Sequence, residues 1–178
     1  MNRLSAVSPA KHPSAKQVAT AYFDAIAQRD LDAMAACWEP GSVDHFYGMA
    51  ELRVPEDLRR WFGNLFAAFP DFAMSVTDMV AYGEKAAVRW AATGTFTGPG
   101  KFEGLNATGA SVAIEGLDLL TIRDGLIRDN RAYTDTAELA RQLGAMPPAG
   151  SAGERAMLGL VNARTAALAG LKRLRERS

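Results

Sequence analysis

Cysteine and histidine are nearly absent from this chain of 178 residues, which holds one cysteine and two histidines. The single cysteine, Cys37, excludes a disulfide framework within the chain and a zinc site built on several cysteines. The histidines, His12 and His45, lie far apart in the sequence, and no His, Cys and Asp cluster has the spacing of a metal site. We therefore expect no bound metal.

Long apolar runs and an excess of charge of either sign are also missing. No uncharged apolar run approaches about 18 residues, so no segment is expected to span a membrane. Residues 1–14 lack the apolar core of a secretory signal, which predicts a cytoplasmic protein. The 20 basic and 20 acidic side chains cancel, which argues against a globally basic nucleic-acid-binding protein.

The cancelling charges are unevenly distributed along the chain. Residues 1–16 contain three basic groups and no acid, and residues 154–178 contain six basic and two acidic groups. The body between them, 17–153, holds 11 basic and 18 acidic groups. An acidic body with two basic ends directs the search for chemistry to the carboxylates of the body.

The N-terminal part of the chain has helical periodicity. Ser14 and Gln17 form a capping-box pattern at the start of a helix that runs to about Gln28. Asp30 can cap a second, short helix, which the breaker Glu39-Pro40-Gly41 should end. Two helices are thus expected before residue 39.

A short extended segment, 43–47, precedes a third predicted helix. Pro55 suits the first position of that helix because its missing N–H would have no partner there, and Pro70 stops the helix. We expect the apolar face of this helix to pack in the core and, as a second role, to line a pocket. It consists of Leu58, Trp61, Phe62, Leu65, Phe66 and Phe69.

After Pro70 the apolar period changes from that of a helix to that of a strand. Strands are predicted over 72–82, 86–97, 111–123 and 126–134. Asp124-Gly125 is a strong hairpin signal between the last two. Helices followed by strands in hairpins predict an α+β domain: a curved antiparallel sheet with three N-terminal helices on its concave face.

The C-terminal region is expected to differ from this domain. We expect a flexible arm over 1–13, one domain over 14–147, and a linker with an amphipathic basic helix over 148–178. The helix itself is predicted over 154–175. It should pack on its own domain or on a neighbouring subunit; contact with an acidic membrane surface is the weaker alternative.

Asp118 is the most informative single residue. It lies in Gly116-Leu117-Asp118-Leu119-Leu120, where both faces of the predicted strand are nearly apolar. Burial there could raise its pKa by up to about 3–5 units, which would suit proton transfer near neutral pH. The alternative is a structural carboxylate paired with an Arg, a Tyr or backbone N–H groups.

His45 and the last strand are the other polar candidates. His45 can shuttle protons or stabilise an oxyanion, although a structural histidine is the more common case. In 126–134, Asn130 and Ala132 share a face, and the polar run as a whole is typical of a solvated face or an oligomer contact. Asp135 is explained as a helix cap.

Several short motifs, in this order, resemble those of the SnoaL-like polyketide cyclases. The resemblance covers about 14–147, and these cyclases share the cone fold of nuclear-transport-factor-like proteins and ketosteroid isomerases. The motifs are Tyr22-Phe23, Val43-Asp44-His45, Ala68-Phe69-Pro70-Asp71, Val88-Arg89-Trp90, Thr93-Gly94-Thr95-Phe96-Thr97-Gly98, Ile122-Arg123-Asp124-Gly125-Leu126-Ile127 and Gln142-Leu143-Gly144.

The resemblance implies a pocket between the helices and the concave sheet face, and a homodimer formed through the convex face or the C-terminal helix. It implies an aldol ring closure of an apolar polyketide-type or polycyclic molecule without any cofactor. We expect Asp118 as the acid or base, with His45 as its polar partner across the pocket. The expected pocket residues are Tyr22, Trp38, Trp61, Phe62, Phe66, Trp90 and Asn130.

The sequence departs from the cyclases at two positions. The position matching Asp118 typically holds a histidine in the cyclases, and the one matching Ala132 holds their essential aspartate. Ala132 cannot move a proton. Two hypotheses therefore remain: a cofactor-independent cyclase or isomerase that uses Asp118, or a non-cyclase tailoring protein, associated with hydroxylation, or ligand-binding module without catalysis.

Overall fold

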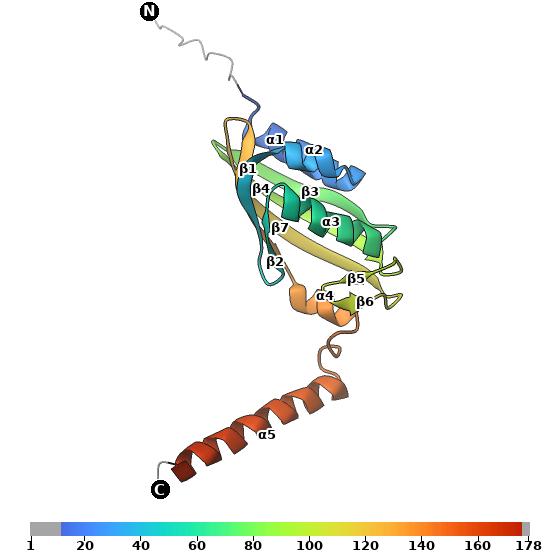
Figure 1. Ribbon diagram of the computed structural model, residues 1–178, viewed down its shortest axis with the longest axis vertical. Helices are drawn as coiled ribbons and strands as arrows, with labels where there is room; N and C mark the ends of the chain where they lie inside the picture. Colours follow the sequence, from blue (N-terminus) through green and yellow to red (C-terminus); the bar gives the residue numbers. More distant parts are fainter. Residues whose placement is uncertain (1–11, 176–178) are drawn as a thin grey trace, which may run out of the picture.

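The computed structural model describes residues 12–175, in which an α+β domain is followed by a separate helix (Figure 1). The predicted arm over 1–13 falls almost entirely outside the described residues. The helices are α1 Ala15–Gln28, α2 Leu31–Ala36, α3 Glu56–Ala68, α4 Thr136–Gln142 and α5 Ala152–Arg175. The strands are β1 Trp38–Phe46, β2 Ala50–Arg53, β3 Ala73–Tyr82, β4 Lys85–Thr95, β5 Lys101–Phe102, β6 Leu105–Asn106, β7 Ser111–Arg123 and β8 Leu126–Thr134.

Six strands form one curved, unclosed sheet in the order β2-β1-β8-β7-β4-β3, and β5 and β6 form a small separate hairpin. The predicted fold class is confirmed, with one refinement to the sheet. All neighbours are antiparallel except β1 and β8, which run parallel and pair Asp44 with Asn130. β2 was not expected from the sequence.

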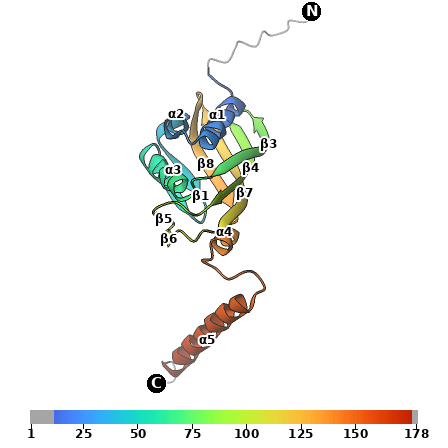
Figure 2. The same cartoon turned by 90° about the vertical axis from the view of Figure 1, so that its right-hand side faces the viewer.

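Helices α1, α2 and α3 lie across one face of the sheet (Figure 2). The capping box of Ser14 and Gln17 starts α1 as predicted, and Arg29 ends it in a left-handed conformation. One side of α1 buries Val18, Tyr22 and Ile26 toward the sheet, because these residues recur at helical spacing. Residues from α1 and α3 and the inner face of the sheet thus form one apolar core.

A close contact between β4 and β7 shapes the floor of this core. Trp90 is paired with Gly116 in the antiparallel register. A Cβ atom at position 116 would lie 2.1 Å from Cζ2 of the Trp90 indole, so only glycine leaves room for the ring. The indole therefore occupies the space that Gly116 leaves free, and its Nε1 reaches Asp118, two residues further along β7.

Helix α5 stands away from the domain (Figure 1). From Arg155 to Ala169 its described side chains are all exposed, including Leu160 at 74% and Leu168 at 56%. Packing of this helix on its own domain was one of the two expectations, and the structure contradicts it. An ion pair between Arg141 and Glu154, 3.8 Å apart, joins α4 to the first turn of α5.

Candidate functional site

An apolar cavity of about 70 Å³, partly open to solvent, lies on the concave side of the sheet between α1, α3 and the strands. Its walls are almost entirely hydrocarbon, and Asp118 is the one carboxylate among the described residues that line it. The lining residues are Tyr22, Phe23, Ile26, Phe46, Met49, Trp61, Phe62, Leu65, Phe69, Phe72, Met74, Trp90, Ala92, Thr93, Phe102, Val112, Ile114, Asp118, Ala132, Tyr133, Thr134 and Leu139.

Asp118 lies on the inner face of β7 and is 4% exposed. Its two oxygens accept different hydrogen bonds: Trp90 Nε1 donates to Oδ1 at 2.8 Å, and Asn130 Nδ2 donates to Oδ2 at 2.7 Å. Burial raises the pKa of Asp118 from 3.8 to about 6, and the two N–H donors oppose this rise because they stabilise the anion. The carboxyl group can therefore take up or release a proton near neutral pH.

A second buried carboxyl group, Asp44, lies behind Asp118 and is fully buried. Its Oδ1 accepts a hydrogen bond from Asn130 Nδ2 at 2.9 Å, and its Oδ2 lies 3.2 Å from the Tyr22 hydroxyl. Burial raises the pKa of Asp44 well above its ordinary value, and the nearby Asp118 adds to the rise. Neither Asp44 nor Asn130 lines the cavity.

The family model for the SnoaL-like polyketide cyclases matches residues 16–143. The chain belongs to this family. Among curated protein sequences none matches it.

Solved structures share this SnoaL-like fold. IdmH from Streptomyces antibioticus, a candidate polyketide cyclase, is 27% identical with a TM-score of 0.59, covering 74% of this chain and 99% of its own. TsrD from Streptomyces laurentii is 25% identical with a TM-score of 0.63, covering 73% and 94%. AclR from Streptomyces galilaeus, a candidate hydroxylase, is 23% identical with a TM-score of 0.65, covering 85% and 94%. At 23% identity, this last likeness shows the fold alone.

The structure of this SnoaL-like chain brings only some of the predicted residues to the cavity. Tyr22, Trp61, Phe62, Trp90 and Asp118 line it. Three others do not, for different reasons. Trp38 packs edge-on against Tyr22, Phe66 packs between Phe62 and Phe72, and Asn130 lies behind Asp118 as its hydrogen-bond donor.

His45 was expected across the pocket from Asp118, but this prediction is wrong, because His45 does not line the cavity. Neighbouring residues of a strand point to opposite faces, so the burial of Asp44 turns His45 outward. Its Nδ1 lies 3.3 Å from Glu51 and its Nε2 lies 3.5 Å from Asp129. The ring also stacks on Tyr47, which in turn stacks on Tyr133.

Sequence reasoning missed two features of the site. Asp44 was noticed only as part of a motif, although the alternation with His45 required one of the two to face the core. The polar run of β8 was expected to be a solvated face or an oligomer contact, with Asn130 in the pocket; Asn130 is instead fully buried behind Asp118, while Arg131 and Tyr133 on the other face are exposed. Ala132 lines the cavity beside Asp118, its register partner, and supplies no proton-transfer group there.

The described residues contain no group of three or more His, Cys, Asp or Glu that could hold a metal ion. None of the helices in residues 12–175 has the length and apolar character that a membrane span requires. What the site offers is a buried carboxyl group at the wall of an apolar cavity, held by two N–H donors. That arrangement suits acid–base chemistry on an apolar small molecule.

Proposed function

We propose that this protein is a cofactor-independent enzyme of the cyclase or isomerase type, which moves a proton at a carbon acid in an apolar polyketide-like or polycyclic small molecule. Asp118 is the group that transfers the proton. The observation that carries the proposal is the position of this carboxyl group: it is 4% exposed, lines an apolar cavity and accepts two N–H hydrogen bonds.

The proposed step begins with the Asp118 carboxylate. It removes a proton from a carbon next to a carbonyl group, so that the C–H bond breaks and an O–H bond forms on Asp118. The electron pair of the C–H bond moves into the enolate. The enolate then either attacks a second carbonyl of the same molecule, which closes a ring, or regains a proton at another atom.

The surroundings of Asp118 support its role as a base. A carboxylate in an apolar wall is poorly solvated, and its raised pKa makes it a stronger base than an exposed one. Trp90 and Asn130 keep enough of it ionised at neutral pH to act. Membership of the SnoaL-like family agrees with cyclase-type chemistry in general.

The size of the cavity indicates that a substrate must open it further. Ligand sites commonly have volumes of about 300–1,000 Å³, whereas this cavity has about 70 Å³. Trp61 and Phe102 pack together at its wall, and Trp61 Nε1 donates a hydrogen bond to Glu103 at 2.9 Å. We propose that movement of the β5–β6 hairpin relative to Trp61 admits the ligand.

The experiment uses β-tetralone, a bicyclic ketone with an acidic CH₂ group, in heavy water. NMR follows the exchange of its α-protons with and without the purified protein at about pH 7.5. The wild type should accelerate exchange, and Asp118→Asn should lower the catalysed rate by about 10²–10⁴-fold. The matched control is Glu115→Gln, which changes a carboxylate on the outer face of the same strand and should keep the wild-type rate.

Two outcomes would contradict the proposal. An exchange rate that Asp118→Asn leaves unchanged would remove Asp118 from the chemistry. Binding of β-tetralone to the wild type, seen as shifted ligand signals, without any accelerated exchange would instead indicate a ligand-binding module.

A further inference from the structure

The proposed step leaves the buried carboxyl group of Asp44 without a use. Asp44 is fully buried on β1 and does not line the cavity. One nitrogen atom, Nδ2 of Asn130, lies 2.9 Å from Asp44 Oδ1 and 2.7 Å from Asp118 Oδ2. The two carboxyl groups are therefore joined by a single amide group.

No cation compensates this pair. Tyr22 from α1 and Asn130 from β8 contact Asp44, and Asp118 from β7 and the outward-facing Asp129 from β8 act on it through their charge. Within the described chain, neither Asp44 nor Asp118 forms an ion pair with Lys, Arg or His. Two buried carboxylates this close cannot both be charged without a large penalty, so one of them holds a proton.

The hydrogen-bond donors show which one is charged. An amide nitrogen has two hydrogens, and both are used: one points at Asp44 and the other at Asp118. Asp118 receives a further N–H from Trp90, so each of its oxygens is stabilised as part of an anion. Asp44 receives one N–H at Oδ1, and the Tyr22 hydroxyl donates to its Oδ2 at 3.2 Å; of the donors around the two carboxyl groups, only this hydroxyl can turn and accept the proton of a neutral acid.

We propose that Asp44 is a positioning residue: as a neutral carboxylic acid it accepts one N–H of Asn130 at Oδ1, donates its own O–H to the Tyr22 hydroxyl, and so holds the other N–H of Asn130 on Asp118. In this arrangement the single negative charge of the cluster lies on Asp118, at the cavity wall. Asn130 cannot turn over, because its carbonyl oxygen would then face the Asp118 carboxylate.

The pKa shifts of the two groups agree with a neutral Asp44 and a charged Asp118. The pKa of Asp44 lies well above its ordinary value because of burial and the nearby Asp118, whereas that of Asp118 rises only to about 6. The inference deepens the proposed function, because the positioned group is the proposed base. Its test, however, reads the titration of the carboxyl groups and needs no turnover, so the two can fail separately.

The test is a carboxyl-carbon NMR titration of the full chain, with the Asp44 and Asp118 signals assigned by their loss in Asp44→Asn and Asp118→Asn. In the wild type, the Asp44 signal should stay at its protonated position throughout the pH range in which the Asp118 signal titrates, with a midpoint near 6 for Asp118. An Asp44 signal that is already ionised at neutral pH would overturn the proposal. Where a variant fails to fold, the carboxyl signals of the wild type can be assigned through their correlations with the backbone, so the wild-type titration still decides the proposal.

The variants separate a neutral from a charged Asp44. Asparagine has the donor and acceptor of a neutral acid, so Asp44→Asn should move the Asp118 midpoint by less than about 0.3 pH units. If Asp44 were charged, the same substitution would lower that midpoint by about 1–3 pH units. Asp44→Ala removes the acceptor that holds Asn130 and should raise the Asp118 midpoint; an unchanged midpoint in this variant would show that Asp44 positions nothing. Glu115→Gln is again the control.

Discussion

At the scale of single residues, the position of Asp118 depends on a glycine two residues before it. Trp90 donates to Asp118 from an indole that fills the space left free by Gly116. The sequence shows the glycine and the carboxylate two residues apart but gives no sign that a tryptophan from another strand links them. The link is a property of the β4–β7 register.

Gly116→Ala tests this link. The new Cβ would lie 2.1 Å from Cζ2 of Trp90, so the indole must move and its hydrogen bond to Asp118 must lengthen or break. We expect a loss of about 1–3 kcal/mol in the free energy of unfolding, and a further rise in the pKa of Asp118 because its anion loses a donor. Urea unfolding and carboxyl titration measure the two effects.

The matched control is Gly159→Ala on α5, where a Cβ would contact nothing within 4 Å. It should leave both the domain's stability and the Asp118 titration unchanged. If Gly116→Ala behaved like this control, the indole would not be held by the glycine as described.

The pH dependence of stability also follows from Asp118. Its pKa is raised from 3.8 to about 6 in the folded chain, so the folded state holds this proton more tightly than the unfolded state does. The stability that comes from this proton is fully present below about pH 4 and is lost as the pH rises through 6. The loss is on the order of 3 kcal/mol, and Asp118→Asn avoids it.

We therefore expect Asp118→Asn to gain stability relative to the wild type between pH 4 and pH 7. Urea unfolding at the two pH values measures this gain, with Glu115→Gln as the reference. If the free energies of unfolding of the wild type and Asp118→Asn differed by the same amount at both pH values, the raised pKa of the buried Asp118 would be contradicted.

At the level of elements, helix α5 buries little of its described surface on the domain. Its described side chains between Arg155 and Ala169 are exposed, and one ion pair at 3.8 Å links its first turn to α4. A chain that ends at Gly150 should therefore fold with a melting temperature within about 2 °C of the full chain, because little packing is lost. Far-ultraviolet circular dichroism should show less helix. A fall of more than about 5 °C would show that α5 packs on the domain.

The elements differ in how well the sequence predicts them. β7 and β8 have the bounds expected from alternation and from the hairpin signal Asp124-Gly125. β1 was expected to begin only after Pro40-Gly41, because these residues usually end an element. The structure instead starts β1 at Trp38 and accommodates them through a shift in its pairing with β8 between Trp38 and Val43. A local pattern cannot reveal such a bulge, because the partner strand permits it.

In the candidate site, too, local sequence predicts some features, whereas others depend on strand pairing. Burial of Asp118 was predicted from its apolar neighbours within β7. The pairing of Asp44 with Asn130 was not predicted, because it arises from the parallel contact of β1 with β8, 86 residues apart in the chain. Burial can thus be read from neighbours in sequence, whereas a hydrogen-bond partner depends on which strands meet.

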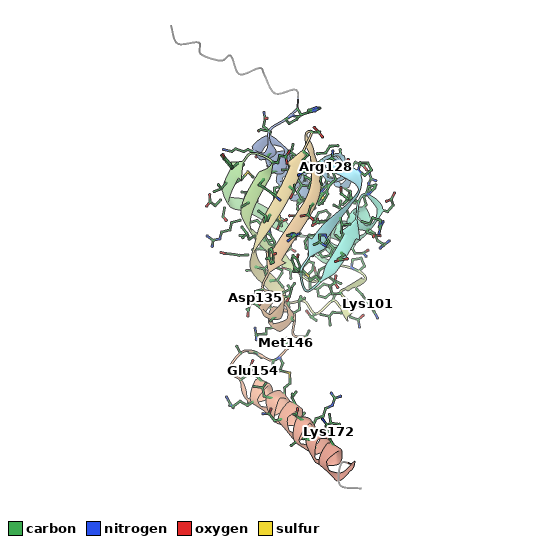
Figure 3. The ribbon with its side chains drawn as sticks, turned by 90° about the vertical axis from the view of Figure 1, so that its left-hand side faces the viewer. Lys101, Arg128, Asp135, Met146, Glu154 and Lys172 are labelled. Atoms are coloured by element: carbon green, nitrogen blue, oxygen red, sulfur yellow. The ribbon has the colours of Figure 1, made fainter. Side chains whose placement is uncertain are left out.

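At the scale of the whole molecule, one face of the sheet carries no helix (Figure 3). The exposed large apolar side chains on this outer face are Tyr47, Val80, Tyr82, Leu117, Leu119 and Tyr133. An exposed apolar area of this kind is typical of a contact surface. We propose that a second copy of the chain covers it, since a two-fold contact lets the same apolar side chains face one another.

Leu119→Lys tests this assembly. Leu119 is 40% exposed near the middle of the outer face, and a lysine there would place like charges together across the two-fold contact. Light scattering should give a dimer for the wild type and a monomer for this variant. Leu160→Lys on α5 is the control and should remain dimeric. A monomeric Leu160→Lys beside a dimeric Leu119→Lys would place the contact on α5 instead.

If Asp118 transfers the proton, the pH profile of α-proton exchange in β-tetralone must follow the titration of its carboxyl group. The catalysed rate should rise with pH and level off above a midpoint near 6, because only the ionised carboxylate is a base. In Asp118→Asn this sigmoidal component should disappear while Glu115→Gln keeps it. A wild-type profile without a midpoint near 6, or one that persists in Asp118→Asn, would contradict the account.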